Sequence, residues 1–138
     1  MITSTSNPQV KFLRSLHLAK HRSESGLFLV EGLKLVGQAF DSNAEIQQII
    51  ISPEWLISDY GKSLVDLAIK KHIDILKLST NAFESIARKD KPQGIAALVK
   101  QNWRDINTLN LNDENQKRIY LAIEAIQNPG NLGTVLRT

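Results

Sequence analysis

Four apolar runs of strand length, separated by stretches with helical spacing, occupy residues 26–100 of this chain. The runs are GLFLVEG, IQQIIIS, IDILKLS and GIAALVK, in that order. Between them, apolar residues recur every three or four positions over residues 33–40 and 63–71, and a short helix is predicted near residues 81–86. Because each helix must cover an apolar face of a sheet, this alternation predicts a layered α/β/α domain with a largely parallel sheet.

Capping residues mark two of the predicted helix starts. Asn7 followed by Pro8 predicts a helix that runs through about Arg22, because the fixed φ of proline suits the first helical position. Asn81 and Glu84 form a predicted capping box for the short third helix between strands.

The predicted N-terminal helix has one apolar and one basic face. The apolar face carries Phe12, Leu13, Leu16 and Ala19, and the opposite face carries Lys11, Arg14, His21 and Arg22. Residues 1–34 contain five basic and two acidic residues, which matches the net charge of +3 of the whole chain. The basic face fits either a solvated helix surface or contact with phosphate groups.

Composition excludes several classes of protein. With 138 residues, 42% of them hydrophobic, the chain can bury a core and is expected to hold one domain and the beginning of another. No run approaches the roughly 18 apolar residues of a membrane span, and the polar N-terminus does not resemble a signal peptide, so a cytoplasmic protein is expected. The absence of cysteine excludes disulfides, and the three histidines form no zinc pattern, so no metal is expected.

A basic loop, RKDKPQG, precedes the fourth predicted strand. Its Lys89 and Lys91 are able to contact a phosphate backbone, although a solvated turn is the alternative. Glu31 lies at the predicted turn from the first strand into a helix, and this position favours a structural role for it over that of a general base. Trp55 and Trp103 are isolated aromatic residues, for which packing is expected rather than stacking on a base.

The last part of the chain changes in character. Residues 101–117 are polar and rich in asparagine, which is typical of a linker. A strand is predicted over residues 118–126, then a glycine-containing turn at 128–133 and the opening of a helix at 134–138. Backbone N–H groups at such a turn can hold an anion, and a plain tight turn is the alternative.

Taken in order, four segments of this chain resemble the SpoU/TrmH branch of the SPOUT-class RNA 2′-O-ribose methyltransferases. The segments are ITSTSNPQVKFLRSL, FLVEGLKLV, KPQGIAALV and IEAIQNPGNLGTVLRT. The resemblance implies an RNA substrate-binding domain over residues 1–100, similar to the small ribosomal proteins that bind kink-turns. A linker over residues 101–117 and the start of an incomplete trefoil-knot methyltransferase domain over residues 118–138 would follow it.

The resemblance also implies roles for individual residues. It places Asn131 and Arg137 in the catalytic site, where the arginine would help to activate a ribose 2′-hydroxyl toward S-adenosylmethionine. The residues that would shape the motif are Glu124, Asn128, Pro129 and Gly133. Those expected to contact RNA phosphates are Lys11, Arg14, Arg22, Lys89 and Lys91, with Glu31 and Gln93 near the RNA.

The family's second and third catalytic motifs would lie after Thr138. The 138 residues alone are therefore expected neither to bind S-adenosylmethionine nor to transfer methyl groups. A full-length protein is expected to be a homodimer acting on ribosomal or transfer RNA, and this part of it a monomer. The alternatives are a stand-alone RNA-binding module and a nucleotide enzyme, the latter disfavoured because the P-loop lysine is missing.

Overall fold

The computed structural model of this chain describes residues 1–108, 121–125 and 129–136. The chain divides into two compact units, Met1–Trp103 and Arg104–Thr138. Along the first unit run α1 (Pro8–Ser15), α2 (Ala19–Ser25), β1 (Leu27–Glu31), α3 (Leu33–Asp41), β2 (Ile46–Ile51), α4 (Asp59–Lys70), β3 (Asp74–Lys77), α5 (Thr80–Glu84) and β4 (Ile95–Lys100). The second unit contains a 3₁₀ turn, η1 (Ile106–Thr108), and α6 (Pro129–Val135).

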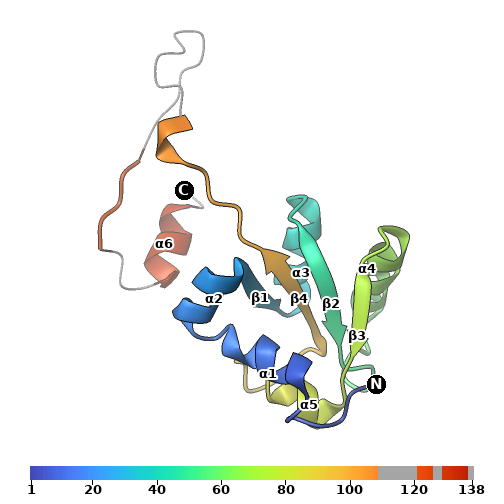
Figure 1. The fold of residues 1–138 in the computed structure, drawn as a ribbon. Helices are drawn as coiled ribbons and strands as arrows, with labels where there is room; N and C mark the ends of the chain where they lie inside the picture. Colours follow the sequence, from blue (N-terminus) through green and yellow to red (C-terminus); the bar gives the residue numbers. More distant parts are fainter. Residues whose placement is uncertain (109–120, 126–128, 137–138) are drawn as a thin grey trace. The chain divides into compact units, whose positions relative to one another are not determined.

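Helices cover both faces of a four-stranded sheet whose strands lie in the order β1-β4-β2-β3 (Figure 1). The central strand β4 alternates its side chains between the two faces. Ile95, Ala97 and Val99 join one hydrophobic cluster, whereas Ala96 and Leu98 join the other. A strand that is buried on both faces requires a helical layer on each side, and the predicted α/β/α layering is therefore observed.

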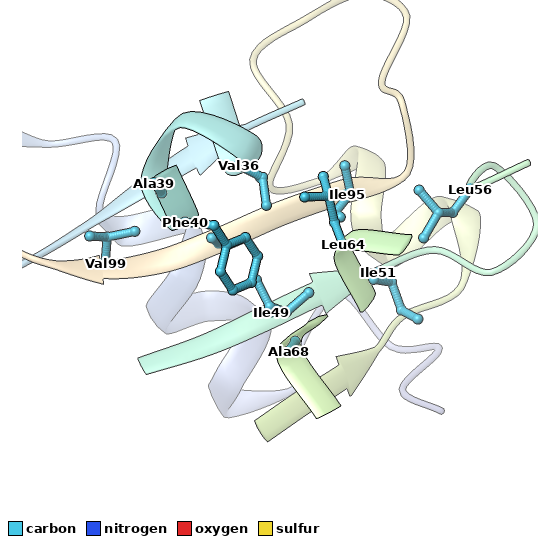
Figure 2. Close-up of a cluster of buried hydrophobic side chains, with 11 residues drawn as sticks. Val36, Ala39, Phe40, Ile49, Ile51, Leu56, Leu64, Ala68, Ile95 and Val99 are labelled. Atoms are coloured by element: carbon cyan, nitrogen blue, oxygen red, sulfur yellow. The ribbon is translucent and has the colours of Figure 1, made fainter. Parts of the chain in front are cut away.

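The first cluster lies between the sheet and the helices α3 and α4. Figure 2 shows the ring of Phe40 among aliphatic side chains of the strands, with Val36 on the same helix. Leu64 and Ala68 extend from α4 into this layer. The buried positions follow the helical spacing in the sequence, which explains why these two helices were predictable.

The second cluster joins α1 and α5 to the opposite face of the sheet. Val10, Leu13 and Leu16 contribute the buried face of the N-terminal segment, and Phe83 is fully buried at the centre. Trp55 packs edge-on against Phe83, with ring centroids 6.2 Å apart and planes at 83°. The packing role that was expected for Trp55 is thereby confirmed.

The sheet is not largely parallel, contrary to the prediction. Only β2 and β3 pair in parallel, because β4 runs antiparallel to both β1 and β2. The connection from β3 to β4 spans residues 78–94, and α5 is its one helix. Because β3 runs parallel to β2 and β4 runs antiparallel to β2, β4 runs in the opposite direction to β3. The chain therefore enters β4 at the end of the sheet where β3 finishes.

The single helix predicted from Pro8 to about Arg22 is two helices. Asn7 caps α1 as predicted, since its Oδ1 accepts a hydrogen bond from Gln9 N at 2.9 Å. At the end of α1 the backbone hydrogen bonds change to the i→i−3 pattern of a 3₁₀ turn, and Leu18 adopts an extended conformation before α2 begins. Phe12, within α1, is 40% exposed, and Ala19, at the start of α2, is also exposed, so both lie outside the core to which the helical periodicity assigned them.

Two further helix starts differ from the prediction. Ser79, not Asn81, caps α5, because its Oγ accepts a hydrogen bond from Ala82 N at 3.3 Å. The helix α4 begins at Asp59, four residues before the predicted start, with Ser58 as its cap. Serine at these positions satisfies N–H groups of the first turn that would otherwise lack an acceptor.

Candidate nucleic-acid interface

Lys11 and Arg14 lie on the outward face of α1, where both side chains are exposed. Val10 and Leu13 on the same helix are buried against the sheet and fix which face points outward. Neither cation lies within 4.0 Å of a carboxylate belonging to a described residue. Their charges are therefore available to an external anion such as phosphate.

Arg22 does not extend into solvent beside them. Its Nη1 donates hydrogen bonds to the carbonyl oxygens of Leu16 and His17, at 2.9 and 2.8 Å. These carbonyls follow the C-terminus of α1, where helix geometry leaves acceptors unpaired. Arg22 thus holds the break between α1 and α2, which corrects the sequence-based placement of this residue on the exposed basic face.

Two further contacts join this break to the segment that follows α5. His17 Nε2 donates to the carbonyl of Ile86 at 2.9 Å, and Arg88 Nη2 donates to the carbonyl of His17 at 2.7 Å. The helical break and the basic loop of residues 88–94 are therefore neighbours. Sequence reasoning missed the roles of His17 and Arg88, because their partners are about 70 residues away along the chain.

Glu31, the last residue of β1, faces the same loop. Its Oε2 accepts a hydrogen bond from the backbone N–H of Arg88 at 2.9 Å. Its Oε1 is buried and accepts no hydrogen bond from any residue that the structure describes. Oε2 thus supports the loop, while Oε1 has no hydrogen-bond partner among the described residues.

Gly32 and Gln93 complete the junction between β1 and α3. Gly32 has φ of 95°, and a Cβ at this position would lie 2.8 Å from Gln93 Oε1 and 3.2 Å from Lys89 Nζ. Gln93 Oε1 accepts from Leu33 N at 3.0 Å and so caps the first turn of α3. The structure therefore brings the predicted residues Glu31, Lys89 and Gln93 together, while Lys91 is exposed in the same loop.

A cavity of about 630 Å³ runs along β1, a strand at the edge of the sheet. Its apolar wall consists of Leu16, Phe28, Leu29, Val30, Leu35 and Ile86. Its polar lining includes the cations of Arg22, Arg88 and Lys89 and the carboxylate of Glu31. An apolar cavity with an excess of positive charge suits a flat, uncharged ring that is attached to an anion.

Trp103 also lines this cavity and is 84% exposed. Its Nε1 donates to Gln101 Oε1 at 2.9 Å, which orients the indole ring. The packing role that the sequence suggested for Trp103 is therefore wrong, because this residue follows the last strand and lies outside both hydrophobic clusters.

The residues assigned to a catalytic motif belong to the second unit. Asn128 and Arg137 lie outside the described residues, and Glu124 and Asn131 are exposed. The helix α6 begins at Pro129, so Asn131 and Gly133 are helical and not part of the predicted turn, and the helix starts before the predicted position 134. Proline suits a first helical position, which accounts for the earlier start.

The strand predicted over residues 118–126 is not formed in the part of it that the structure describes. Residues 121–125 carry no strand, and Ala125 has φ of 55°. A strand requires a hydrogen-bonded neighbour, and the sheet of the first unit contains only β1 to β4.

Within the described residues no helix is long and apolar enough to cross a membrane. The same residues contain no group of three or more histidine, aspartate or glutamate side chains placed to hold a metal ion.

Residues 7–97 match the family described as the MRM3-like substrate binding domain. Over 138 residues the chain is 33% identical to the Bacillus subtilis (strain 168) protein named 23S rRNA (guanosine(2553)-2′-O)-methyltransferase RlmP. That alignment covers 99% of this chain and 49% of the relative. The chain thus spans about half the length of the curated relatives that it matches.

Solved structures similar to this chain include RNA methyltransferases as well. A crystal structure of an RNA 2′-O ribose methyltransferase superposes with a TM-score of 0.75 at 25% identity, covering 99% of this chain and 50% of that one. An AdoMet-bound rRNA methyltransferase from Sinorhizobium meliloti superposes with a TM-score of 0.62 at 28% identity. The second match covers 75% of this chain and 37% of the other.

Proposed function

This chain belongs to the family of the MRM3-like substrate-binding domain, and from that premise we propose that residues 1–100 bind the RNA substrate of a ribose 2′-O-methyltransferase. The RNA would be structured ribosomal or transfer RNA, held in the manner of the kink-turn-binding ribosomal proteins. Residues 101–117 would link this domain to the start of a methyltransferase domain at residues 118–138. The relatives whose names contain rRNA or tRNA methyltransferase support this assignment.

The observation that carries the proposal is the cation-lined cavity along β1. Three cations and one carboxylate line it, and its apolar wall suits a base that has left its helix. A phosphate backbone that approaches this edge would meet Lys89 and Lys91 on the loop and Lys11 and Arg14 on α1. These four side chains are exposed and would position the RNA without reading its sequence.

Arg22, Glu31 and Gln93 take a different part in the proposal. Arg22 and Gln93 bond to the protein's own backbone and would keep the loop and the helical break in place for RNA binding. Glu31 shares that structural role through Oε2, and its second oxygen faces no described partner.

For the whole protein we infer methyl transfer from S-adenosylmethionine to a ribose 2′-hydroxyl. Asn131 and Arg137 would stabilise the developing alkoxide, because a cation and hydrogen-bond donors favour negative charge on oxygen. Glu124, Asn128, Pro129 and Gly133 would shape the surrounding chain. S-adenosylmethionine would supply the methyl group, which its sulfonium sulfur carries.

These 138 residues are not expected to bind S-adenosylmethionine by themselves. The α6 side chains whose exposure is described are half-buried or exposed, which supports that expectation. The proposal therefore includes no methyl transfer by these 138 residues alone, which correspond to about half of the relatives. In a full-length homodimer the remaining sequence would provide the methyl-donor pocket.

Fluorescence anisotropy with a labelled structured RNA, measured over a range of salt concentrations, tests the RNA-binding proposal. The wild-type chain is expected to bind more weakly as salt rises, and the double variant Lys11→Ala/Arg14→Ala to bind with a slope shallower by about two. The matched control is Lys70→Ala/Lys71→Ala, which removes two exposed cations from the end of α4 on the opposite face of the sheet. Equal slopes for the two double variants would contradict the proposal.

A further inference from the structure

Glu31, whose Oε1 is unpartnered among the described residues, lines a cavity in which the other charged side chains are all cationic. Oε1 is buried without a hydrogen bond from any described residue, although a buried carboxylate oxygen normally accepts one. The carboxylate of Glu31 also lies more than 4.0 Å from every described side-chain nitrogen of lysine, arginine and histidine, so none of these residues forms an ion pair with it. A ligand that donates hydrogen bonds at this point would satisfy the oxygen.

The orientation of Glu31 is fixed by its neighbours. Oε2 is held by Arg88 N at 2.9 Å, so the carboxylate cannot rotate without losing that bond. Gly32 follows with φ of 95°, and the side chains of Gln93 and Lys89 lie against it. The direction of Oε1 is therefore fixed, but the atom is closed to solvent, so a ligand that bonds to it must displace a side chain that covers it.

The rest of the cavity fits the other parts of a nucleotide. Phe28, Val30 and Leu35 offer an apolar wall, and the exposed indole of Trp103 offers a surface on which a base can stack. The side chains of Arg88 and Lys89 line the same cavity and suit the phosphate that accompanies the base. A volume of about 630 Å³ lies within the roughly 300–1,000 Å³ usual for small-molecule sites.

The four bases differ in what they would present to this acceptor. Guanine carries two adjacent donors, N1–H and the N2 amino group, with no acceptor between them. Adenine and cytosine place a ring nitrogen acceptor beside their amino group, and uracil places a carbonyl on each side of N3–H. These acceptors would repel a carboxylate, whereas guanine would not.

We propose that the cavity along β1 receives an unpaired guanine of the bound RNA, and that Glu31 Oε1 selects it by accepting hydrogen bonds from N1–H and the N2 amino group. This inference rests on the proposed function, since it requires that RNA binds to this face. Glu31 is then a specificity-determining residue, while Lys11 and Arg14 contribute affinity without regard to sequence.

The test compares short hairpin RNAs that differ only at one bulged nucleotide: guanosine, inosine, adenosine or none. With the wild-type chain the guanosine bulge is expected to bind about tenfold more tightly than the adenosine bulge, with inosine between them because it lacks the N2 amino group. The variant Glu31→Gln is expected to abolish the preference. Arg88 N–H requires the remaining side-chain oxygen, so the amide NH₂ would occupy the position of Oε1 and oppose the donors of guanine.

The control variant is Glu54→Gln, which removes one exposed carboxylate outside the cavity lining and is expected to retain the preference for guanosine. Thermal unfolding of Glu31→Gln checks that the variant folds; if it does not, the inosine and adenosine comparisons with the wild-type chain decide the matter. Equal binding of all the hairpins would overturn the selection of guanine and leave the proposed function standing. Failure of every hairpin to bind would overturn both.

Discussion

The carboxylate of Glu31 accepts a hydrogen bond from the backbone N–H of Arg88, which lies 57 residues further along the chain, at 2.9 Å. This bond joins the end of an edge strand to the loop that precedes the central strand β4. Arg88 in turn donates through its side chain to the carbonyl of His17, beyond the end of α1. One residue thus links three segments that are far apart in the sequence, and the cavity along β1 is built at their junction.

Arg22→Ala is expected to change mainly the stability of the fold, and Arg14→Ala mainly the salt dependence of RNA binding. Removing Arg22 leaves the carbonyls of Leu16 and His17 without this donor, so the free energy of unfolding should fall by about 1–2 kcal/mol. Removing the exposed Arg14 should change it by less than about 0.5 kcal/mol but reduce the salt slope of RNA binding by about one. Urea denaturation and anisotropy titrations measure the two quantities. A stable Arg22→Ala protein with a reduced slope would return Arg22 to the phosphate-binding set.

Gly32→Ala is expected to destabilise the protein more than Gly26→Ala. Both glycines have positive φ, 95° and 67°, but a Cβ at position 26 would meet nothing within 4 Å, whereas one at position 32 would lie 2.8 Å from Gln93 Oε1. Gly26→Ala should therefore cost about 1 kcal/mol from backbone strain alone, and Gly32→Ala about 2–3 kcal/mol. Thermal unfolding of both variants gives the comparison, and equal costs would show that the collision with Gln93 is relieved easily.

Ser79→Ala is expected to cost about 1 kcal/mol, because the first turn of α5 loses the acceptor of Ala82 N. Asn81→Ala should be nearly neutral, since Asn81 is exposed and does not cap the helix. Chemical denaturation of the two variants measures the difference. If Asn81→Ala were the more damaging change, the cap predicted from the sequence would be correct after all.

Phe83→Ala and Phe12→Ala compare two phenylalanines that helical periodicity treats alike. Phe83 is fully buried beneath Trp55, and its removal should leave a cavity that lowers the free energy of unfolding by about 3–5 kcal/mol. Phe12 is 40% exposed, so its removal should cost about 1 kcal/mol or less. Calorimetry on both variants would detect such a gap, and similar losses would mean that Phe12 is packed in solution.

Much of the first unit was predictable from local pattern. The runs that became β1, β2, β3 and β4 are rich in aliphatic residues, and Val36, Phe40, Leu64 and Ala68 recur at helical spacing. The Asn7-Pro8 start of α1 also followed from the sequence, because a cap is a local interaction between neighbouring residues. The direction of β4 was not predictable, because nothing local to that strand specifies which end of the sheet it enters.

The candidate nucleic-acid interface also has some features that the sequence predicts and others that only the tertiary structure decides. The sequence by itself determined which segments fold into strands and helices, and it marked Glu31, Lys89 and Gln93 as residues near a turn and a basic loop. Only the tertiary structure decided that these residues meet, that Arg22 bonds to backbone carbonyls, and that Trp103 borders a cavity. The physical reason is range: periodicity and capping act over a few residues, whereas the Glu31–Arg88 and His17–Ile86 contacts exist only after the whole sheet has formed.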